Sequence, residues 1–192
     1  MKNPIDVTRK WIEAVVVGCN FCPFAAKELK AGTIRYTVQE SEDFKTLQEA
    51  LLAECEWLDD HPETETSLLI LTKAVAEFED YLDLVEVADE LLQVNEYEGV
   101  YQVASFHPKY RFEDSAPGDP ANYTNRSPYP MLHLLREASV EAALERCPES
   151  DSIPERNVEF AREKGLGFMR SLRQSASMGE PAAPEVSASE PA

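Results

Sequence analysis

Apolar residues recur along the chain in stripes that are typical of helices. A stripe with a spacing of four residues begins at Val7 and predicts an amphipathic helix over residues 5–18. Similar stripes predict a helix that starts after the candidate N-cap Ser41, and another helix over residues 77–94. Three amphipathic helices in the first half of the chain require a shared apolar surface to pack against.

Strand patterns separate these helices. Residues 33–39 alternate between apolar and polar side chains, residues 67–72 form a short continuous apolar run, and residues 99–106 give a third β-rich segment. Strands that alternate with helices are typical of right-handed crossovers in a parallel or mixed sheet. We therefore predict a single α/β domain with a three-stranded parallel or mixed sheet and flanking helices.

The second half of the chain is less regular. Residues 107–129 show no periodicity, but they contain aromatic residues and arginines, which favours a functional loop over disorder. Helices are predicted over residues 130–146 and 154–165. The Ser, Ala, Pro and Glu composition from Gln174 onward predicts a disordered tail over residues 174–192, which leaves a domain over residues 1–173.

The charge balance limits the classes of partner. The chain carries 36 acidic and 18 basic residues, a formal net charge of −18, so it repels phosphate backbones and anionic membranes on average. We expect no nucleic-acid partner and no membrane association, although a local basic patch can still hold a small anion. No apolar run approaches the roughly 18 residues of a membrane helix, and no signal peptide is evident, so we expect a cytoplasmic protein.

Two cysteines share a short motif, Cys19-x-x-Cys22. This spacing suits a redox pair or half of a metal site, and it also occurs in tightly packed corners. A redox pair prefers a strand before it and a helix after it, whereas here a helix is predicted before the motif and Pro23 follows at once. Cys55 lies on an apolar helical stripe, which indicates core packing.

A histidine follows the third predicted strand. His107 lies just past the carboxyl end of that strand, where α/β sheets place ligands and catalytic groups. The nearby Lys109 and Arg111 would favour a neutral imidazole, and Tyr110 lies between them. The alternative is a loop histidine that is hydrogen-bonded to the backbone.

The segment before the predicted helix over residues 130–146 suits an anion. Arg126 and Ser127 would lie at the helix N-terminus, where free N–H groups and the positive end of the dipole bind carboxylate or phosphate. On that helix His133, Arg136 and Glu137 would share one face, so that Glu137 could orient or charge His133 as a base or metal ligand. An internal network of salt bridges and caps is the alternative.

Three of these segments together carry a resemblance. The motifs are Phe-Cys-Pro-Phe-Ala at 21–25, Gln-Val-Ala-Ser-Phe-His-Pro at 102–108, and Asn-Arg-Ser-Pro-Tyr-Pro at 125–130, which continues to His-Leu-Leu-Arg-Glu at 133–137. In this order they resemble a bacterial family of domains of unknown function, over roughly residues 5–170. The resemblance implies that these segments form the site. It centres the first motif on Cys22, because Cys19 lies outside it.

Several functions remain open at this point. A small-molecule enzyme acting on an anionic substrate would use two groups of residues: Cys22, His107, His133 and Glu137 for catalysis, and Tyr110, Asn125, Arg126, Ser127 and Arg136 for substrate binding. A metal protein would bind zinc or copper through Cys22, His107 and His133. A non-catalytic module would capture an anion or acidic peptide at Arg126, and a structural role would only tie the long loop to the sheet. No nucleotide-phosphate or nucleophile-elbow motif is present, and the sequence assigns no reaction, cofactor or oligomeric state.

Overall fold

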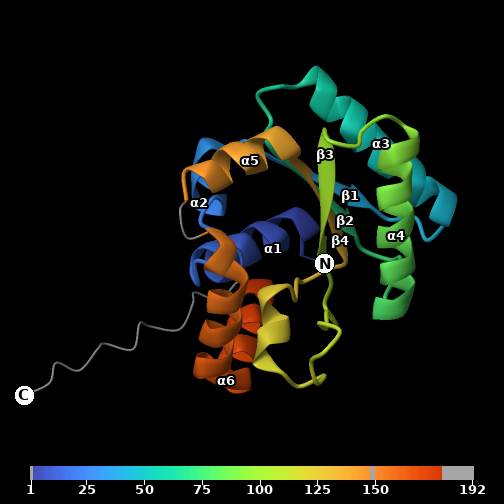
Figure 1. The fold of residues 1–192 in the computed structure, drawn as a ribbon. Coiled ribbons are helices and arrows are strands. Elements are labelled where there is room, and N and C mark those ends of the chain that lie inside the picture. Colours follow the sequence, from blue (N-terminus) through green and yellow to red (C-terminus); the bar gives the residue numbers. More distant parts are fainter. Residues whose placement is uncertain (1, 148–149, 179–192) are drawn as a thin grey trace, which may run out of the picture.

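A computed structural model describes residues 2–147 and 150–178, which form a mixed sheet with helices on both sides (Figure 1). The strands are β1 (Ile34–Gln39), β2 (Thr66–Leu71), β3 (Tyr101–Phe106) and β4 (Met131–Arg136). The α-helices are α1 (Pro4–Trp11), α2 (Ala25–Ala31), α3 (Phe44–Asp60), α4 (Phe78–Val94), α5 (Glu137–Glu145) and α6 (Ile153–Met178). The shorter helices are η1 (Ile12–Val17), η2 (Pro120–Thr124) and η3 (Ser150–Ser152).

The four strands lie in the order β1-β2-β4-β3. β1 and β2 are parallel, whereas β4 lies between β2 and β3 and is antiparallel to both. All six residues of β2 are buried, as the continuous apolar run predicted for a central strand. The prediction of an α/β fold with a mixed sheet is therefore confirmed.

The prediction of three strands is wrong, because β4 was interpreted as the first part of a helix over residues 130–146. Met131–Arg136 is a strand, and only the residues from Glu137 onward are helical. The strand is covered on both faces, so apolar residues point both ways and the sequence shows no clean alternation. A short apolar run of this kind does not distinguish a central strand from a buried helix.

The sheet divides the molecule into two sides. We call the side that α3 and α4 cover the α3/α4 side, and the opposite side, where α1, η1 and α6 pack, the α1/α6 side (Figure 1). Alternate residues of each strand belong to different sides: Leu132 and Leu134 of β4 face α3 and α4, whereas Met131 faces α1 and α6. This alternation decides which candidate site residues can meet.

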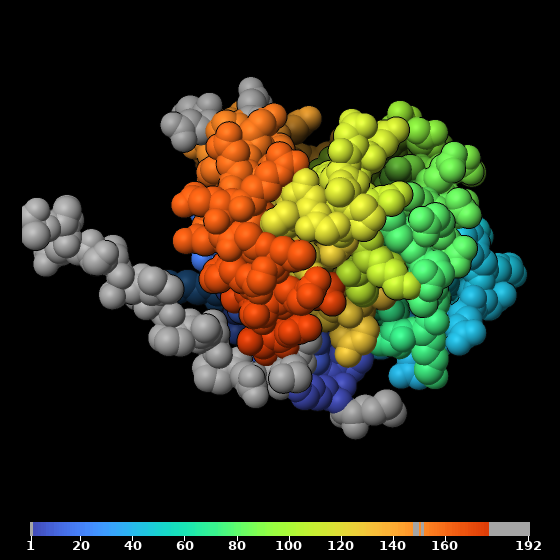
Figure 2. Space-filling model, turned by 90° about the horizontal axis from the view of Figure 1, so that it is seen from below, coloured from blue at the N-terminus to red at the C-terminus, as the bar shows by residue number. Residues whose placement is uncertain are grey.

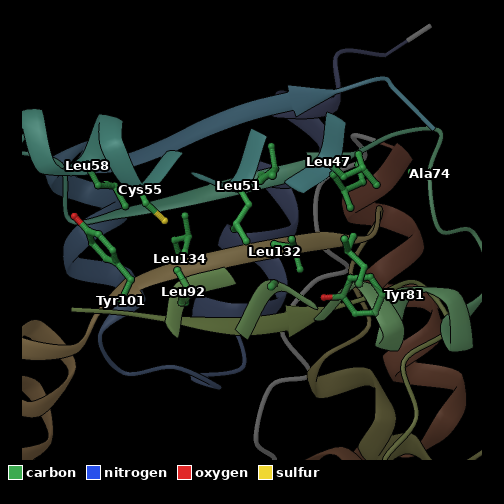
Figure 3. Close-up of a cluster of buried hydrophobic side chains, with 14 of the residues drawn as sticks. Leu47, Leu51, Cys55, Leu58, Ala74, Tyr81, Leu92, Tyr101, Leu132 and Leu134 are labelled. Carbon is green, nitrogen blue, oxygen red and sulfur yellow. The ribbon is translucent and has the colours of Figure 1, made fainter. Parts of the chain in front are cut away.

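The α3/α4 side is a closed apolar core (Figure 3). Leucines from α3, β2 and β4 meet Tyr81 of α4 and Tyr101 of β3 there. Cys55 lies in this core with no exposed surface, and burial together with nearby carboxylates raises the pKa of its thiol to about 12. Its predicted role in core packing is confirmed.

The helix predicted over residues 5–18 is present, but it changes type. The α-helical part ends at Trp11, and η1 continues it as a π-helix. Helices of this type are rare, and many of those that occur lie at functional sites. After the Cys19–Cys22 corner comes α2, a helix that we did not predict. The N-cap of α3 is Asp43 rather than Ser41, since the Asp43 carboxylate accepts the Thr46 N–H at 2.9 Å.

The last helix is longer than predicted. α6 begins near Pro154 as expected, but it runs through Gly165 to Met178 with a sharp change of direction at Gly165. The backbone angles there, φ 79° and ψ 163°, lie in a region that only glycine adopts readily. Residues 174–178 are thus helical, although we expected them in the tail, and the rest of that predicted tail lies outside the described residues.

Among residues 2–147 and 150–178, none of the helices combines the length and the apolar character that a bilayer crossing demands.

Candidate functional site

The long loop after β3 folds back so that two of the sequence motifs meet. The His107 N–H donates to the Asn125 carbonyl oxygen at 3.3 Å, and the Asn125 side-chain amide donates to the Ser105 carbonyl at 3.4 Å. One residue further on, Arg126 Nε donates to the Tyr110 carbonyl at 2.9 Å. Residues 105–110 and 125–126 therefore form one hydrogen-bonded unit.

His107 anchors this unit to α4. Its ring is fully buried, with Nε2 3.0 Å from the Val75 carbonyl oxygen and Nδ1 accepting the Lys109 N–H at 3.0 Å. This pattern assigns the proton to Nε2, and burial lowers the pKa of the imidazole. Val75 itself has φ 47°, which is strained for a β-branched residue. With both ring nitrogens bonded to backbone, the geometry favours the structural alternative for His107.

His133 lies in the interior of the sheet. It faces the α1/α6 side from β4, and its Nε2 lies 2.7 Å from the Thr66 hydroxyl oxygen. The Thr66 hydroxyl donates its hydrogen to the Leu134 carbonyl, so Nε2 must be the donor to Thr66. Burial lowers the pKa of His133 to about 4, which keeps the ring neutral near pH 7.

The predicted face of His133, Arg136 and Glu137 does not exist, because His133 and Arg136 lie on a strand and point to opposite sides of the sheet. Glu137 is the first residue of α5, and its N–H donates to the Val100 carbonyl at 3.0 Å. The interpretation of Glu137 as a partner of His133 rested on helical spacing and is wrong.

Arg136 acts as a clamp on the α3/α4 side. Its guanidinium donates to the carbonyl oxygens of Leu58 at 2.6 Å and His61 at 3.3 Å, at the end of α3. It also donates to the Thr64 carbonyl at 3.1 Å and to the Tyr101 hydroxyl at 3.2 Å. These bonds occupy the side chain with protein acceptors, so a substrate-binding role for Arg136 gains no support.

The two cysteines of the first motif lie in a tight corner. Both are half-buried free thiols, and burial raises the pKa of Cys19 to about 11 in spite of the nearby Lys164. The N-terminal half of α6 holds the corner, because Arg156 donates to the Asn20 carbonyl at 2.6 Å and Asn157 donates to the Phe21 carbonyl at 2.7 Å. This environment disfavours the thiolate that a redox pair needs.

The proposed Cys–His combinations are not assembled. Cys22 packs in the cluster on the α1/α6 side, whereas the His107 ring packs against Phe78 and Tyr81 of α4 on the other side of the sheet. Among residues 2–147 and 150–178, no group of three His, Cys, Asp or Glu side chains is placed to hold a metal ion. The three-ligand set of Cys22, His107 and His133 is therefore not brought together in the described structure.

Ser127 is occupied within the loop. Its side chain is fully buried, and its hydroxyl donates to the Tyr129 carbonyl at 2.5 Å. No helix begins near it, since β4 follows the loop directly. The predicted anion site at a helix N-terminus is thus absent, and the remaining candidate from that segment is the guanidinium of Arg126.

Arg126 belongs to a cluster of arginines around Tyr123, which we call the arginine cluster (Arg126, Arg170, Arg173 and Tyr123). The guanidinium carbons of Arg126 and Arg173 lie 4.8 Å and 5.8 Å from the centroid of the Tyr123 ring. The side chain of Arg170 reaches the Tyr123 hydroxyl. Figure 2 shows why they meet: the C-terminal half of α6, coloured orange-red, lies against the yellow segment that carries η2.

Backbone carbonyl groups hold two of these arginines. Arg126 donates to the carbonyl oxygens of Tyr110 and Pro117 at 2.9 Å and 3.0 Å, and Arg173 donates to the Pro108 carbonyl at 2.7 Å. These bonds to backbone acceptors fix the two side chains in place. The positions are thus organised before any ligand arrives.

The electrostatics of the cluster reflect this accumulation of positive charge. Burial raises the pKa of Tyr123, but the bonds and charges of Arg170, Arg126 and Arg173 outweigh it and bring that pKa below its ordinary value. Burial and repulsion from Arg126 and Arg170 lower the pKa of Arg173. Neither Arg126 nor Arg170 forms an ion pair within the described part of the chain.

Sequence reasoning singled out Arg126 but missed Tyr123, Arg170 and Arg173. One signal was available: residues 164–178 contain no acidic residue, although the chain as a whole has 36. A base-only segment in so acidic a chain indicates a local positive surface. Its position beside Arg126 depends on how α6 packs, which composition does not reveal.

Comparison with known proteins identifies a family. The sequence profile described as Protein of unknown function (DUF1415) matches residues 3–171, which is most of the chain. No curated protein and no solved structure matches the chain significantly.

Proposed function

We propose that this chain, which belongs to the family described as Protein of unknown function (DUF1415), binds a small anionic ligand at the arginine cluster. The observation that carries the proposal is the convergence of three guanidinium groups on Tyr123, two of them held by backbone carbonyls. Guanidinium groups bind carboxylate and phosphate through paired, charge-assisted hydrogen bonds. A phosphate or carboxylate group is therefore the chemical class that fits.

The rest of the molecule limits the ligand to a small one. With a net charge of −18, the chain repels polyanions at long range. For a nucleic acid or an anionic membrane, this repulsion would outweigh the attraction of the arginine cluster. A small anion experiences mainly the nearby arginines, because salt screens distant charges beyond about 8 Å at physiological ionic strength. This supports binding of a metabolite-sized anion.

The proposal is one of binding rather than catalysis. His107 and Ser127 are occupied by backbone groups, and Cys22 lies in a different part of the structure from His107. Tyr110 and Asn125, which we expected to contact substrate, contribute to the loop that holds Arg126, the first through its carbonyl oxygen and the second through its bonds to residues 105–107. They are positioning residues in this proposal.

The experiment is a thermal-denaturation series in inorganic phosphate and in citrate, with sodium chloride added to hold the ionic strength constant. A ligand that binds only the folded state raises Tm as its concentration passes Kd. We expect both anions to raise Tm in the unmodified protein. In Arg170→Gln the apparent affinity should fall about tenfold, since a charge-assisted contact contributes about 1.5 kcal/mol.

The matched control is Arg111→Gln, which removes an exposed positive charge from the same loop without touching the described contacts of Tyr123. It should keep the rise in Tm within about twofold of the original affinity. An anion-dependent rise that survives intact in Arg170→Gln, or that disappears equally in Arg111→Gln, would contradict the proposal.

A further inference from the structure

A separate pocket opens beside the edge strand β1. Its volume is about 170 Å³, and it lies where α1, η1 and α2 approach the strand. The residues that line it are Arg9, Glu13, Leu29, Gly32, Ile34 and Tyr36. None of them belongs to the arginine cluster, so the pocket raises an independent question.

Two opposite charges face the pocket without neutralising each other. Arg9 and Glu13 lie four residues apart on one continuous helical stretch, a spacing that often produces an ion pair. Yet neither is found in an ion pair among residues 2–147 and 150–178. The Arg9 guanidinium instead lies 5.2 Å from the centroid of the Tyr36 ring. One cationic and one anionic group thus remain available at the same opening.

A third polar group points to a missing partner. The Tyr36 hydroxyl oxygen is buried and has no partner at ordinary hydrogen-bond geometry within the described structure, where Arg9 is its nearest polar neighbour. Burial raises the pKa of this phenol and outweighs the charge and the hydrogen-bonding contact of the adjacent Arg9 side chain, so it stays a protonated donor at neutral pH. Buried polar groups without a partner are uncommon, because leaving them unsatisfied costs free energy. A ligand atom in the pocket would supply the missing hydrogen bond.

The remaining lining is apolar. Leu29 of α2 and Ile34 of β1 are half-buried and contribute aliphatic surface beside the three polar groups. At about 170 Å³ the pocket admits only a small molecule. The pocket has room for a head group that carries one positive and one negative charge, and for one short aliphatic group.

We propose that this pocket binds a free α-amino acid with a small aliphatic side chain. Its carboxylate would pair with Arg9, its ammonium group with Glu13, and its side chain would lie on Leu29 and Ile34. The Tyr36 hydroxyl would donate to the ligand carboxylate. This site lies apart from the arginine cluster and does not depend on the function proposed for that cluster.

The test is an NMR titration of the full chain, following backbone amide shifts around the pocket. The probe is L-valine, compared with isovalerate, which lacks the ammonium group, and isobutylamine, which lacks the carboxylate. We expect valine to shift these amides at concentrations at least about tenfold lower than either analogue, because each analogue leaves one charge unpaired. Equal shifts for all three compounds, or none with valine at tens of millimolar, would overturn the proposal.

Variants separate ligand binding from structure. In Tyr36→Phe no hydrogen bond of ordinary geometry is lost from the free protein, so Tm should change little, while valine affinity falls about fivefold. Arg9→Gln and Glu13→Gln should each weaken valine about tenfold, and Lys10→Gln, an exposed neighbour outside the pocket, should leave it unchanged. A Tyr36→Phe variant that loses Tm but keeps valine affinity would show a structural role and contradict the site.

Discussion

The two sides of the sheet differ in whether every buried polar atom of the described residues has a hydrogen-bond partner. On the α3/α4 side, Glu54 accepts two bonds from Arg35, at 2.7 Å and 3.1 Å, and a short bond from the Ser67 hydroxyl. Arg136 likewise finds carbonyl and hydroxyl acceptors there. On the α1/α6 side, the buried polar atoms of Thr8, Trp11 and Tyr36 lack hydrogen-bond partners within the described residues.

We infer that the α3/α4 side mainly contributes stability, whereas the α1/α6 side offers groups for ligand binding. A side on which the buried polar groups all have hydrogen-bond partners gains rigidity, and it has no hydrogen-bonding group left for a ligand. A side that keeps buried polar atoms without partners is less stable than it could be, and a ligand that bonds to them can recover part of that free energy. Both proposed sites, and the π-helix η1, lie on or next to the α1/α6 side. Mutations can test this comparison, because we expect them to change the free energy of unfolding in opposite directions on the two sides.

The largest expected effect is on the α3/α4 side. Glu54→Ala would leave Arg35 and Ser67 without their shared acceptor, and Glu54 itself is only 5% exposed. We expect the free energy of unfolding to fall by about 3 kcal/mol, measured by urea denaturation. The control is Glu49→Ala on the same helix, whose pair with Lys45 is exposed and should contribute about 0.3 kcal/mol. Equal losses in the two variants would contradict the idea of a matched interior.

An intermediate effect concerns the pH dependence of folding. The pKa of His133 is about 4 in the folded chain, below its ordinary value of about 6.5, so the unfolded chain takes up the proton more readily. His133 should therefore reduce the free energy of unfolding as pH falls from about 6.5 towards 4. Allowing for the partial exposure of the ring, we expect a loss of about 2 kcal/mol.

Urea denaturation of the unmodified protein and His133→Gln between pH 7 and 5 measures this effect. Burial also lowers the pKa of His107, so some dependence should remain in the variant. The slope of the free energy of unfolding against pH should nevertheless be smaller in His133→Gln. Identical slopes would mean that His133 is solvated or already charged in the folded chain.

The smallest effect has the opposite sign and lies on the α1/α6 side. Thr8→Val removes a buried hydroxyl that has no hydrogen-bond partner and keeps a β-branched shape in α1. Because no bond is lost and a desolvated polar group is removed, we expect a gain of about 0.5 to 1 kcal/mol in the free energy of unfolding. Thermal and urea denaturation both report it, and a loss of stability would mean that the Thr8 hydroxyl is satisfied after all.

The sequence predicted the parts of the fold in which one pattern dominates. The helices that become α3 and α4, and the strands that become β1, β2 and β3, follow from stripes and short β-rich runs. β4 was missed because a strand buried on both faces has no period of two. α2 was missed because it is only seven residues long and none of them is fully buried, so no stripe marks it.

The candidate site was predicted less completely. Arg126 was identified, and residues 105–110 and 125–126 do meet, but the roles given to His133, Arg136 and Glu137 depended on a helix that is a strand. Tyr123 and the arginines of α6 come together through tertiary packing of segments about fifty residues apart. Such proximity depends on the direction of α6 after Gly165, which local sequence patterns do not encode.

The position of β4 also sets the order in which the sheet can be completed. β3 has β4 as its strand neighbour, and β2 reaches the β3 half of the sheet through β4, which follows all the others along the chain. During synthesis the parallel pair β1 and β2 can form early, whereas β3 must wait until Met131–Arg136 has left the ribosome. The pairing of β4, the strand that the sequence pattern indicated as a helix, is therefore the last step in forming the sheet. Until then, the unpaired edges of β2 and β3 are exposed to association with other chains.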